Sequence, residues 1–467
     1  MQKYWFFDSA LMRAAANVRA VPDNAVKRAE NWLFSEGLYD TPSLPWEPRF
    51  DNGYPNVFFD PLLGKYRCYY TSFIRDDVSA ATPPERRAGM RYKTDGTRVV
   101  GLLYAESADG LCWEKPPLGV TPWMGTRRNN IVMAHAHGAI VLLDPEEKDP
   151  ARRYKMLMRM DAPEKKLCAA FSADGVRFST PEPLRFDGDA PGDTHNFVLR
   201  DAAAGGYALY TRMFTRELRT VGRMHSEDFL HWSAPREVFC GQGADDQIYA
   251  MPVFRQEGLY FGLAAVFYAG DRDRPHHDHV EVELAFSGDG LRWQRVAPGR
   301  PLIANGPDAY DAGCCFASPP VREGDDYRLY YMGGNGTHYA FRQTGLCLAT
   351  LPAAKLAGIT AEDAGRPFVF QTARLLAAGG EWQVCADVGA GGGITYALLD
   401  AAGEPLPGFD EARCAPITAS CLRAPLRWAD APPVPEAPVM LRFTGRNATL
   451  YSCLLYTSDA ADDLTRV

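Results

Sequence analysis

Four copies of one short phrase constrain the fold of this chain more than any other feature. The copies read SADGLCW, SADGVRF, SEDFLHW and SGDGLRW, and they begin at Ser107, Ser172, Ser226 and Ser287. The copies are 54 to 65 residues apart, an interval that suits about four short strands with their loops. The sequence therefore predicts a repeated, all-β unit.

The residue types in each phrase fit a tight turn. Its Asp can accept backbone N–H groups across the turn, and Gly110, Gly175 and Gly290 supply the positive φ that such a turn favours. Phe229 replaces the glycine in the third copy, so we expect that turn to differ somewhat. The aromatic residue three positions later is expected to fill the space between adjacent sheets. We interpret the phrase as architecture and not as a catalytic motif.

A second repeated element lies between the phrases. It consists of an apolar strand, an acidic or Gly-containing turn, and a Tyr-rich strand. Its five copies occupy residues 56–73, 139–160, 196–214, 251–268 and 318–334. Five copies predict five blades of a β-propeller, and the last blade, which lacks the phrase, is expected to pair with the N-terminal part of the chain, for example residues 31–39. Short helices are expected only near residues 8–18 and 352–357.

The character of the chain changes after Pro367, where alternating strands are joined by Gly-rich and Pro-rich turns. We predict an all-β chain in which a five-bladed β-propeller is followed by a truncated β-sandwich. The predicted parts are an N-terminal segment (1–44), the propeller (45–352), a linker (353–366) and the sandwich (367–452), which would lack its last strand. We interpret residues 453–467, CLLYTSDAADDLTRV, as translated sequencing adaptor.

Composition narrows the function. A net charge of −8 without a basic patch argues against nucleic acid and anionic membranes as partners. No stretch approaches the roughly 18 apolar residues that cross a bilayer. Asp8 and Arg13 interrupt any signal-peptide core, so we expect a cytoplasmic protein with reduced cysteines. Nucleotide-binding and serine-nucleophile motifs do not occur, and we expect neither a cofactor nor a metal.

The blade phrases, together with the blade openings DNGYPNVFFD and DTHNFVLRD, resemble those of the five-bladed β-propeller glycoside hydrolases. This superfamily includes glycoside hydrolase families 32, 43, 68 and 130. The resemblance covers roughly residues 45–352. It implies a glycosidase that acts on a carbohydrate substrate, with carboxylates where the innermost strands open toward a central funnel.

The resemblance also implies roles for individual residues. Asp51 matches the acidic residue that opens the first blade, so it is expected to be the nucleophile or general base. Asp193 would be a transition-state or pKa-modulating carboxylate, and Asp246 the general acid. Hydrolysis needs such a set because one carboxylic acid protonates the leaving oxygen while a second carboxylate attacks or activates water. The expected substrate-binding residues are Asn52, Tyr54, Asn130, His195, Asn196, Asp245, Tyr249, Asp311 and His338.

The resulting hypothesis is an exo-acting glycoside hydrolase that binds a terminal sugar of an oligo- or polysaccharide. Two alternatives stay open. Families 32 and 43 use Glu as the acid, and no predicted blade opening contains Glu, which favours a non-catalytic carbohydrate-binding propeller. An inverting glycoside phosphorylase would show Arg, Lys or His beside a single acid.

The His-rich stretch RPHHDHVEVE (274–283) offers a further acid. Glu281 or Glu283 would be the general acid if the strand that contains them lay nearer the central funnel than we place it. We favour a loop facing substrate or solvent over a metal site, because the spacing of His279, Glu281 and Glu283 alone does not make a tetrahedral site.

Overall fold

The structure of this chain is a computed structural model, and it describes residues 2–28, 31–40, 42–376 and 380–456. These residues are nearly all β, and the one α-helix among them is α1 (Asp77–Ala81). Single 3-10 turns are η1 (Ser9–Leu11), η2 (Pro84–Arg86), η3 (Pro150–Arg152), η4 (Ala309–Asp311) and η5 (Ala353–Lys355). No helix in the described ranges is long and apolar enough to span a membrane.

The chain divides into two compact units, which we call the sandwich unit and the propeller unit. The sandwich unit comprises Met1–Asn24, Gly324–Asp326 and Leu351–Val467. The propeller unit comprises Ala25–Glu323 and Tyr327–Thr350. Residues 1–44, which we expected to form a single N-terminal segment, are therefore shared between the two units.

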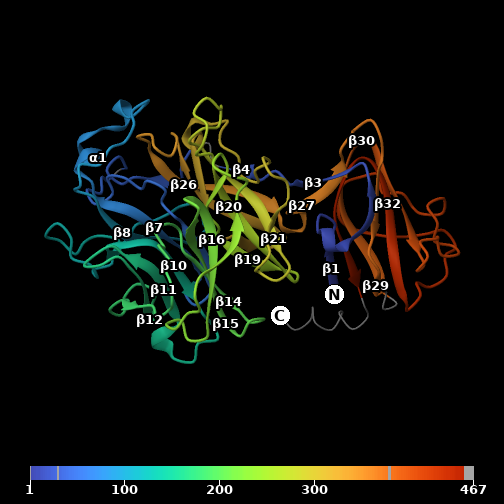
Figure 1. The fold of residues 1–467 in the computed structure, drawn as a ribbon, viewed down its shortest axis with the longest axis horizontal. Helices are drawn as coiled ribbons and strands as arrows, with labels where there is room; N and C mark the ends of the chain where they lie inside the picture. Colours follow the sequence, from blue (N-terminus) through green and yellow to red (C-terminus); the bar gives the residue numbers. More distant parts are fainter. Residues whose placement is uncertain (1, 29–30, 41, 377–379, 457–467) are drawn as a thin grey trace. The chain divides into compact units, whose positions relative to one another are not determined.

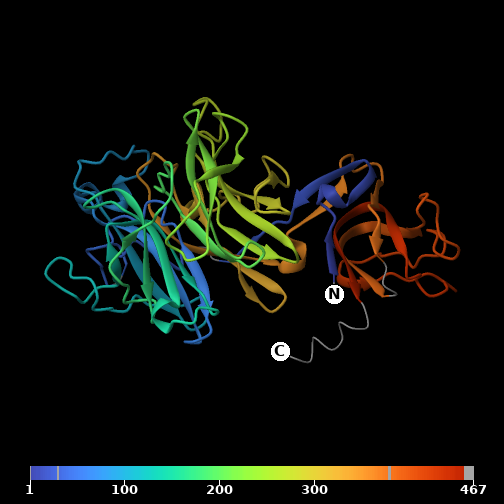
Figure 2. The ribbon, with the colours of Figure 1, turned by 60° about the horizontal axis from the view of Figure 1, so that its bottom comes forward.

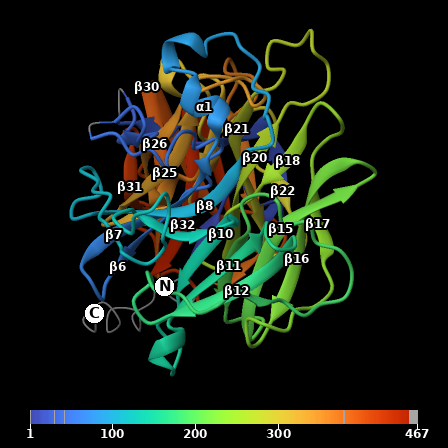
Figure 3. The ribbon, with the colours of Figure 1, turned by 90° about the vertical axis from the view of Figure 1, so that its left-hand side faces the viewer.

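Three antiparallel sheets of four strands begin the propeller unit, and neighbouring strands follow one another in the chain (Figure 3). The first contains β6 (Asn56–Asp60), β7 (Lys65–Arg75), β8 (Val99–Ser107) and β9 (Ile131–Ala134). The second contains β10 (Ala136–Leu143), β11 (Tyr154–Met160), β12 (Lys166–Ser172) and β13 (Glu182–Pro183). The third contains β14 (Phe197–Asp201), β15 (Gly206–Thr215), β16 (Leu218–Ser226) and β17 (Arg236–Cys240).

The rest of the propeller unit forms one eleven-stranded sheet. Its first half contains β18 (Gln247–Ala250), β19 (Val253–Gln256), β20 (Leu259–Phe267), β21 (Val280–Ser287) and β22 (Gln294–Arg295). Its second half contains β23 (Cys314–Ala317), β24 (Val321–Glu323), β25 (Asp326–Gly334), β26 (Thr344–Pro352), β4 (Val26–Lys27) and β5 (Phe34–Ser35). One parallel pair, Val280 with Cys314, joins the halves. Because the sheet runs through both, the count of five blades stays a prediction.

The ends of the propeller unit meet at β26. Ser35 and Phe34 of β5 pair with Gly345 and Leu346, and β4 pairs with the same strand further along. β5 lies within residues 31–39, the stretch that we expected to pair with the last blade. The first strands also lie together, since β6, β10, β14 and residues 319–322 line an apolar cavity of about 480 Å³.

All four copies of the repeated phrase form the same turn. In the first copy the Asp109 carboxylate accepts the N–H groups of Leu111 and Cys112, and the Ser107 hydroxyl accepts that of Gly110. The expectation that the third turn differs is wrong. Phe229 has φ +72°, within a few degrees of Gly110 at +74°, and its copy makes the corresponding bonds.

Tyrosine hydroxyls join neighbouring sheets at these turns. Tyr69 of β7 donates to the Gly175 carbonyl at 2.8 Å, and Tyr210 and Tyr330 donate to Gly290 and Gly110, each at 3.0 Å. In the third copy a different pair of residues forms this contact between neighbouring sheets. Leu157 of β11 stands at the register position of these tyrosines, and both it and the fully buried Phe229 belong to one apolar cluster. A Tyr–Gly pair is thus replaced by a Leu–Phe pair.

The sandwich unit is a nine-stranded sheet folded around one core. Two long strands, β30 (Glu381–Leu399) and β32 (Pro438–Tyr456), pair along their lengths (Figure 1). β32 also pairs in turn with β29 (Leu375–Leu376), β28 (Phe368–Thr372), β27 (Ala357–Ala361) and β1 (Gln2–Trp5). The remaining strands are β2 (Met12–Ala16), β3 (Val18–Pro22) and β31 (Cys421–Pro425), and β1–β3 are the blue strands beside the orange and red ones in Figure 2.

The structure changes the expected boundaries of the sandwich region. The short helices expected near residues 8–18 and 352–357 are the 3-10 helices η1 and η5, and most of residues 8–18 forms strands. The stretch 353–366, expected to be a linker, contains β27 and belongs to the sheet. Within the described residues β1–β3 supply strands that residues 367–452 lack. Cys453 is buried in β32 opposite Tyr4, although we assigned it to a foreign tail, and residues 457–467 of that tail lie outside the described residues.

Candidate active site

Asp51 lies just before β6 and is held between two arginines. Its Oδ1 is 2.8 Å from Nη2 of Arg49 and 3.4 Å from Nη2 of Arg342. Burial acts to raise the pKa of Asp51, but the two guanidinium groups outweigh it and hold that pKa below its ordinary value. The side chain is 30% exposed, so an ionised carboxylate is presented to solvent.

A hydrogen-bonded series leads from Asp51 to a second carboxylate. Arg342 donates to Oδ1 of Asn52 at 2.6 Å, and the Asn52 amide donates to the hydroxyls of Tyr54 and Tyr249 at 2.9 and 3.1 Å. Arg212 lies over the Tyr249 ring, 4.0 Å from its centroid, and donates to its carbonyl at 2.8 Å. The series therefore runs without a break from Asp51 to Arg212.

Arg212 ends the series at Asp193. Its Nη1 lies 3.3 Å from Oδ1 of Asp193, whose side chain is 31% exposed. Arg212 lies in β15, and Asp193 lies just before β14 of the same sheet. This ion pair therefore belongs to a single sheet. Asp51 and Asp193, from different sheets, are thereby fixed in one network.

The ring of Tyr54 connects a third carboxylate to the network. It stacks on His137 of β10 and on His195, with centroids 6.1 and 5.7 Å away. His137 Nδ1 lies 3.2 Å from Asp161, and Arg159 donates to Asp161 at 2.7 Å. Burial acts to raise the pKa of Asp161, but His137 and Arg159 outweigh it and lower that pKa. Asp161 is 25% exposed, so it is accessible as well.

Two histidines at the site are neutral. Burial lowers the pKa of His195 to about 3, and its Nε2 has no partner in the described residues. Burial, with Arg342 second, lowers the pKa of His338 to about 3. Nε2 of His338 lies 3.1 Å from the Tyr249 hydroxyl. Neutral imidazoles can donate and accept hydrogen bonds, which suits the hydroxyls of a sugar.

We call these residues the central group. It brings together six of the expected site residues, Asp51, Asn52, Tyr54, Asp193, Tyr249 and His338, with His195 against the Tyr54 ring. It adds six residues that were not expected from the sequence, Arg49, His137, Arg159, Asp161, Arg212 and Arg342. Their role in binding or catalysis stays a prediction.

Two expected substrate ligands use their amides within the fold. Asn196 donates to the carbonyls of Gly192 and Gly138 at 2.9 and 3.1 Å. Asn130 donates to the Tyr70 hydroxyl at 2.8 Å and accepts from Trp46 at 2.7 Å. Both side chains are buried, and no hydrogen bond among the described residues joins either of them to a side chain of the central group.

The expected general acid also lies elsewhere. Asp246 pairs with Arg295 at 2.7 Å, and Arg295 pairs with the buried Glu283 at 3.1 Å. Its neighbour Asp245 accepts the N–H of Asp271 at 2.8 Å and pairs with Arg274 at 3.2 Å. No hydrogen bond or ion pair among the described residues links either carboxylate to the central group.

Asp311 is a structural carboxylate. It is fully buried, with Oδ2 2.5 Å from the Lys27 ammonium and 2.8 Å from the Tyr331 hydroxyl. Since Lys27 lies in β4 and Tyr331 in β25, Asp311 ties the closing strands together. Among the described residues no group of three or more His, Cys, Asp or Glu side chains is arranged to hold a metal ion.

Comparisons with known proteins find similar structures but no sequence match. No protein-family model and no curated protein matches this chain. An α-L-arabinofuranosidase from Podospora anserina is 12% identical over 71% of this chain and 99% of that chain, with a TM-score of 0.46. An N-acetylgalactosamine deacetylase from F. plautii is 14% identical over 73% and 97%, with a TM-score of 0.44.

A third structure comes from work on the GH130 family of mannoside phosphorylases, which contains glycoside hydrolases that target β-1,2-mannosidic linkages in Candida mannan. It is 16% identical over 70% of this chain and 94% of that chain, with a TM-score of 0.44. We argue the function of this chain from the residues of its own site.

Proposed function

We propose that this chain is a glycoside hydrolase that removes a terminal sugar from an oligo- or polysaccharide. The observation that carries the proposal is the central group, in which three partly exposed carboxylates from different sheets are fixed by arginines and surrounded by Tyr and His side chains. Glycoside hydrolysis needs at least two such carboxyl groups on either side of the scissile bond.

We assign the base to Asp51. Because Arg49 and Arg342 keep it ionised, it can take a proton from the water that attacks the anomeric carbon. We move the acid from Asp246 to Asp193, whose carboxylate has a single arginine partner at 3.3 Å, whereas Asp51 has two. As the bond to the leaving sugar breaks, Asp193 would give its proton to the leaving oxygen. Asp161, held by two partners, would stabilise positive charge on the ring.

The test is turnover of a panel of chromogenic glycosides by the wild type and three variants. Asp51→Asn and Asp193→Asn are each expected to lower kcat by about 10²- to 10⁴-fold, the usual contribution of a general acid or base. Asp246→Asn is the matched control, because it also breaks an Asp–Arg pair but outside the central group. Equal losses in all three variants would contradict the assignment, and sugar binding without any turnover would support the non-catalytic alternative.

One observation favours a glycoside phosphorylase as the second candidate. Arg49, Arg159, Arg212 and Arg342 all lie in the central group, and guanidinium groups are suited to binding phosphate. In that reaction a phosphate oxygen attacks the anomeric carbon while the acid protonates the leaving oxygen. Turnover that requires inorganic phosphate, with release of a sugar phosphate, would select it over hydrolysis.

A further inference from the structure

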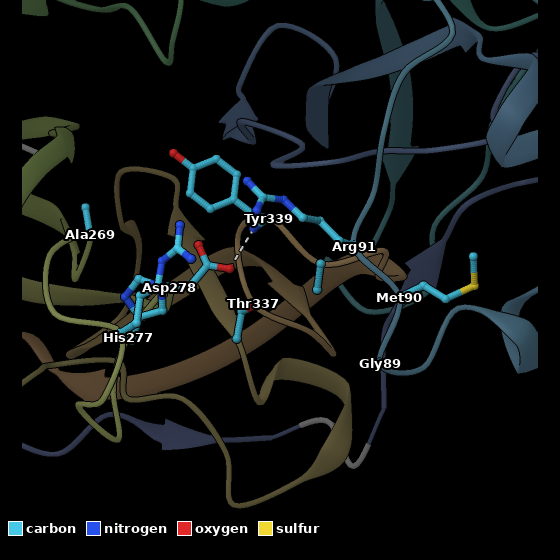
Figure 4. Close-up of a pocket in the computed structure, with 10 residues that line it drawn as sticks. Gly89, Met90, Arg91, Ala269, His277, Asp278, Thr337 and Tyr339 are labelled. Carbon is cyan, nitrogen blue, oxygen red and sulfur yellow. Dashed lines mark hydrogen bonds between the residues drawn. The ribbon is translucent and has the colours of Figure 1, made fainter.

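A cavity of about 530 Å³ lies beside the central group. Three segments of the propeller unit line it, residues 89–91, 269–278 and 337–340 (Figure 4). Its volume is in the range of sites that bind small molecules. The middle segment includes part of the His-rich stretch, for which the proposed reaction gives no role.

Backbone hydrogen bonds fix the three segments to one another. Phe341 donates to the Met90 carbonyl at 2.6 Å, and Tyr92 donates to the Tyr339 carbonyl at 3.1 Å. On the other side, His338 donates to the Asp278 carbonyl at 2.8 Å. The cavity therefore has walls that are formed before any ligand binds, which lowers the entropic cost of binding.

The segment at 337–340 belongs to the cavity and the central group at once. His338 contacts Tyr249, while the next residue, Tyr339, lines the cavity. Arg342, the partner of Asp51, donates to the carbonyls of Thr337 and His338 at 3.1 and 2.6 Å. A ligand in the cavity would therefore lie next to a sugar held by the central group.

Asp278 provides a buried acceptor without a partner. Its side chain is 7% exposed, and Oδ2 accepts the N–H of Tyr339 at 2.9 Å, as the dashed line in Figure 4 marks. Oδ1 has no hydrogen-bond partner in the described part of the chain. A buried carboxylate oxygen left unpaired is costly, so it points to a ligand that donates a hydrogen bond, as a sugar hydroxyl does.

Tyr339 offers an exposed aromatic face in the same cavity. The residue is 43% exposed, and the guanidinium of Arg91 lies 5.3 Å from its ring centroid. Figure 4 shows Arg91 beside this ring. An aromatic ring with one open face can pack against the apolar C–H face of a sugar.

The remaining charges favour a negative ligand. Arg91 and Arg272 are both exposed and line the cavity, and neither forms an ion pair with any described residue. Other exposed arginines nearby are paired, for example Arg274 with Asp245. Two unpaired guanidinium groups attract a carboxylate or sulfate, and they bind such groups with paired N–H donors.

We infer that this cavity is a second sugar subsite, selective for a sugar ring that carries a negatively charged group. Asp278 accepts a ring hydroxyl, Tyr339 packs against the ring, and Arg91 with Arg272 binds the acidic substituent. This inference rests on the proposed function, because the acidic sugar bound here would be the neighbour of the terminal sugar that the enzyme removes.

Binding measured by calorimetry separates the subsite from the reaction. The probes are D-glucuronate, D-glucose 6-sulfate, D-glucose and inorganic sulfate. We expect both anionic sugars to bind the wild type at least tenfold more tightly than D-glucose. Asp278→Asn keeps an oxygen that accepts the N–H of Tyr339 but replaces the oxygen that has no partner. It should therefore lower the affinity for both anionic sugars about tenfold. Arg272→Gln should remove most of the preference for the anionic sugars.

Control variants make the result specific. Arg274→Gln removes a paired arginine from the same segment and should change no affinity, and Asp246→Asn, outside both the cavity and the central group, should bind the probes as the wild type does. Binding of sulfate as tight as that of the anionic sugars, or no sugar binding at millimolar concentration, would overturn the inference. Turnover of a neutral glycoside with no anionic preference would overturn the subsite alone, whereas anionic binding without any turnover would overturn only the proposed reaction.

Discussion

Phe229 shows how one position of a repeat can change its residue without changing the backbone. Its φ of +72° lies in the left-handed region, which costs a non-glycine residue about 1–2 kcal/mol. The ring is fully buried, with the rings of Phe171, Tyr207 and Trp232 at 6.0, 5.1 and 5.7 Å. Burial of an aromatic side chain offsets this backbone cost.

This balance predicts an unusual order of stability at residue 229. Phe229→Ala loses the buried ring, which costs about 3–5 kcal/mol, and keeps the backbone strain. Phe229→Gly loses the ring but relieves the strain, so it should be about 1 kcal/mol more stable than Phe229→Ala. Urea unfolding measures both variants.

Gly205→Ala isolates the backbone term, because Gly205 has φ +77° and an added Cβ would meet no atom within 4 Å. It should cost about 1 kcal/mol. An alanine variant at 229 that is as stable as the glycine variant would contradict the argument.

Residues of the site were predictable from the sequence only where the repeats place them at the start of a strand. Asp51, Asp193 and Tyr249 stand where strands begin, and strand openings can be located from the repeats. Asp161 directly follows β11, and Arg342 lies just before β26, which comes after the last copy of the repeated element. Nothing in the sequence indicates that these residues face His137 and Asp51. The same pattern led us to expect Asp246 in the site. A residue's position along the chain shows that it lies at a strand opening, but it does not show where the side chain points, and Asp246 points to Arg295.

At the level of elements, β5 shows how a two-residue strand is held. Glu36 follows it directly, is fully buried, and accepts the N–H of Thr344, the first residue of β26, at 3.1 Å with each oxygen. Burial, opposed by Arg87, raises the pKa of Glu36 to about 7 from an ordinary 4.5. The closing strand is therefore tied down by a carboxyl group whose charge depends on pH.

This pKa predicts a pH-dependent stability. Between pH 4.5 and 7 the folded state holds a proton on Glu36 that the unfolded state releases, so the stability due to this group is lost as the pH rises. Relative to Glu36→Gln, the wild type should lose about 1.4 kcal/mol per pH unit across that window. Urea unfolding at several pH values measures the difference, and a constant difference from pH 4.5 to 7 would refute it.

Strands were easier to predict than helices in this chain. The Tyr-rich and apolar runs alternate over five to seven residues, and the structure has strands at each of the five copies. The alanine-rich run at 12–16 favours a helix by propensity, yet it forms β2 and pairs with β28. Pairing with a strand more than 350 residues away overrides the local preference, and a local pattern cannot contain that information.

For the whole molecule, the first 35 residues serve two cores. Phe6 is buried in the sandwich unit, with the rings of Phe370 and Phe443 at 5.3 and 5.1 Å. Phe34 is buried in the propeller unit beside Tyr70, at 5.2 Å. A boundary drawn from composition at residue 44 could not show this division, because strand partners and not composition decide which unit a segment joins.

Substitutions at these two positions should therefore weaken different units. Phe6→Ala should destabilise the sandwich unit by about 3–5 kcal/mol and lower amide protection first in β28 and β32. Phe34→Ala is the matched control and should lower protection first in β26 and β7. Hydrogen exchange followed by mass spectrometry measures both. Loss of protection in the same strands by both variants would contradict the division.

The pairing of β5 with β26 also sets the order in which the chain can be assembled during synthesis. Ser35 and its partner Gly345 are about 310 residues apart, so the N-terminal strand leaves the ribosome long before β26 exists. Closing so long a segment carries an entropic cost that grows with the logarithm of its length. β5 therefore stays without its partner strand until β26 has been translated, and an unpaired strand edge in a nascent chain favours aggregation during that interval.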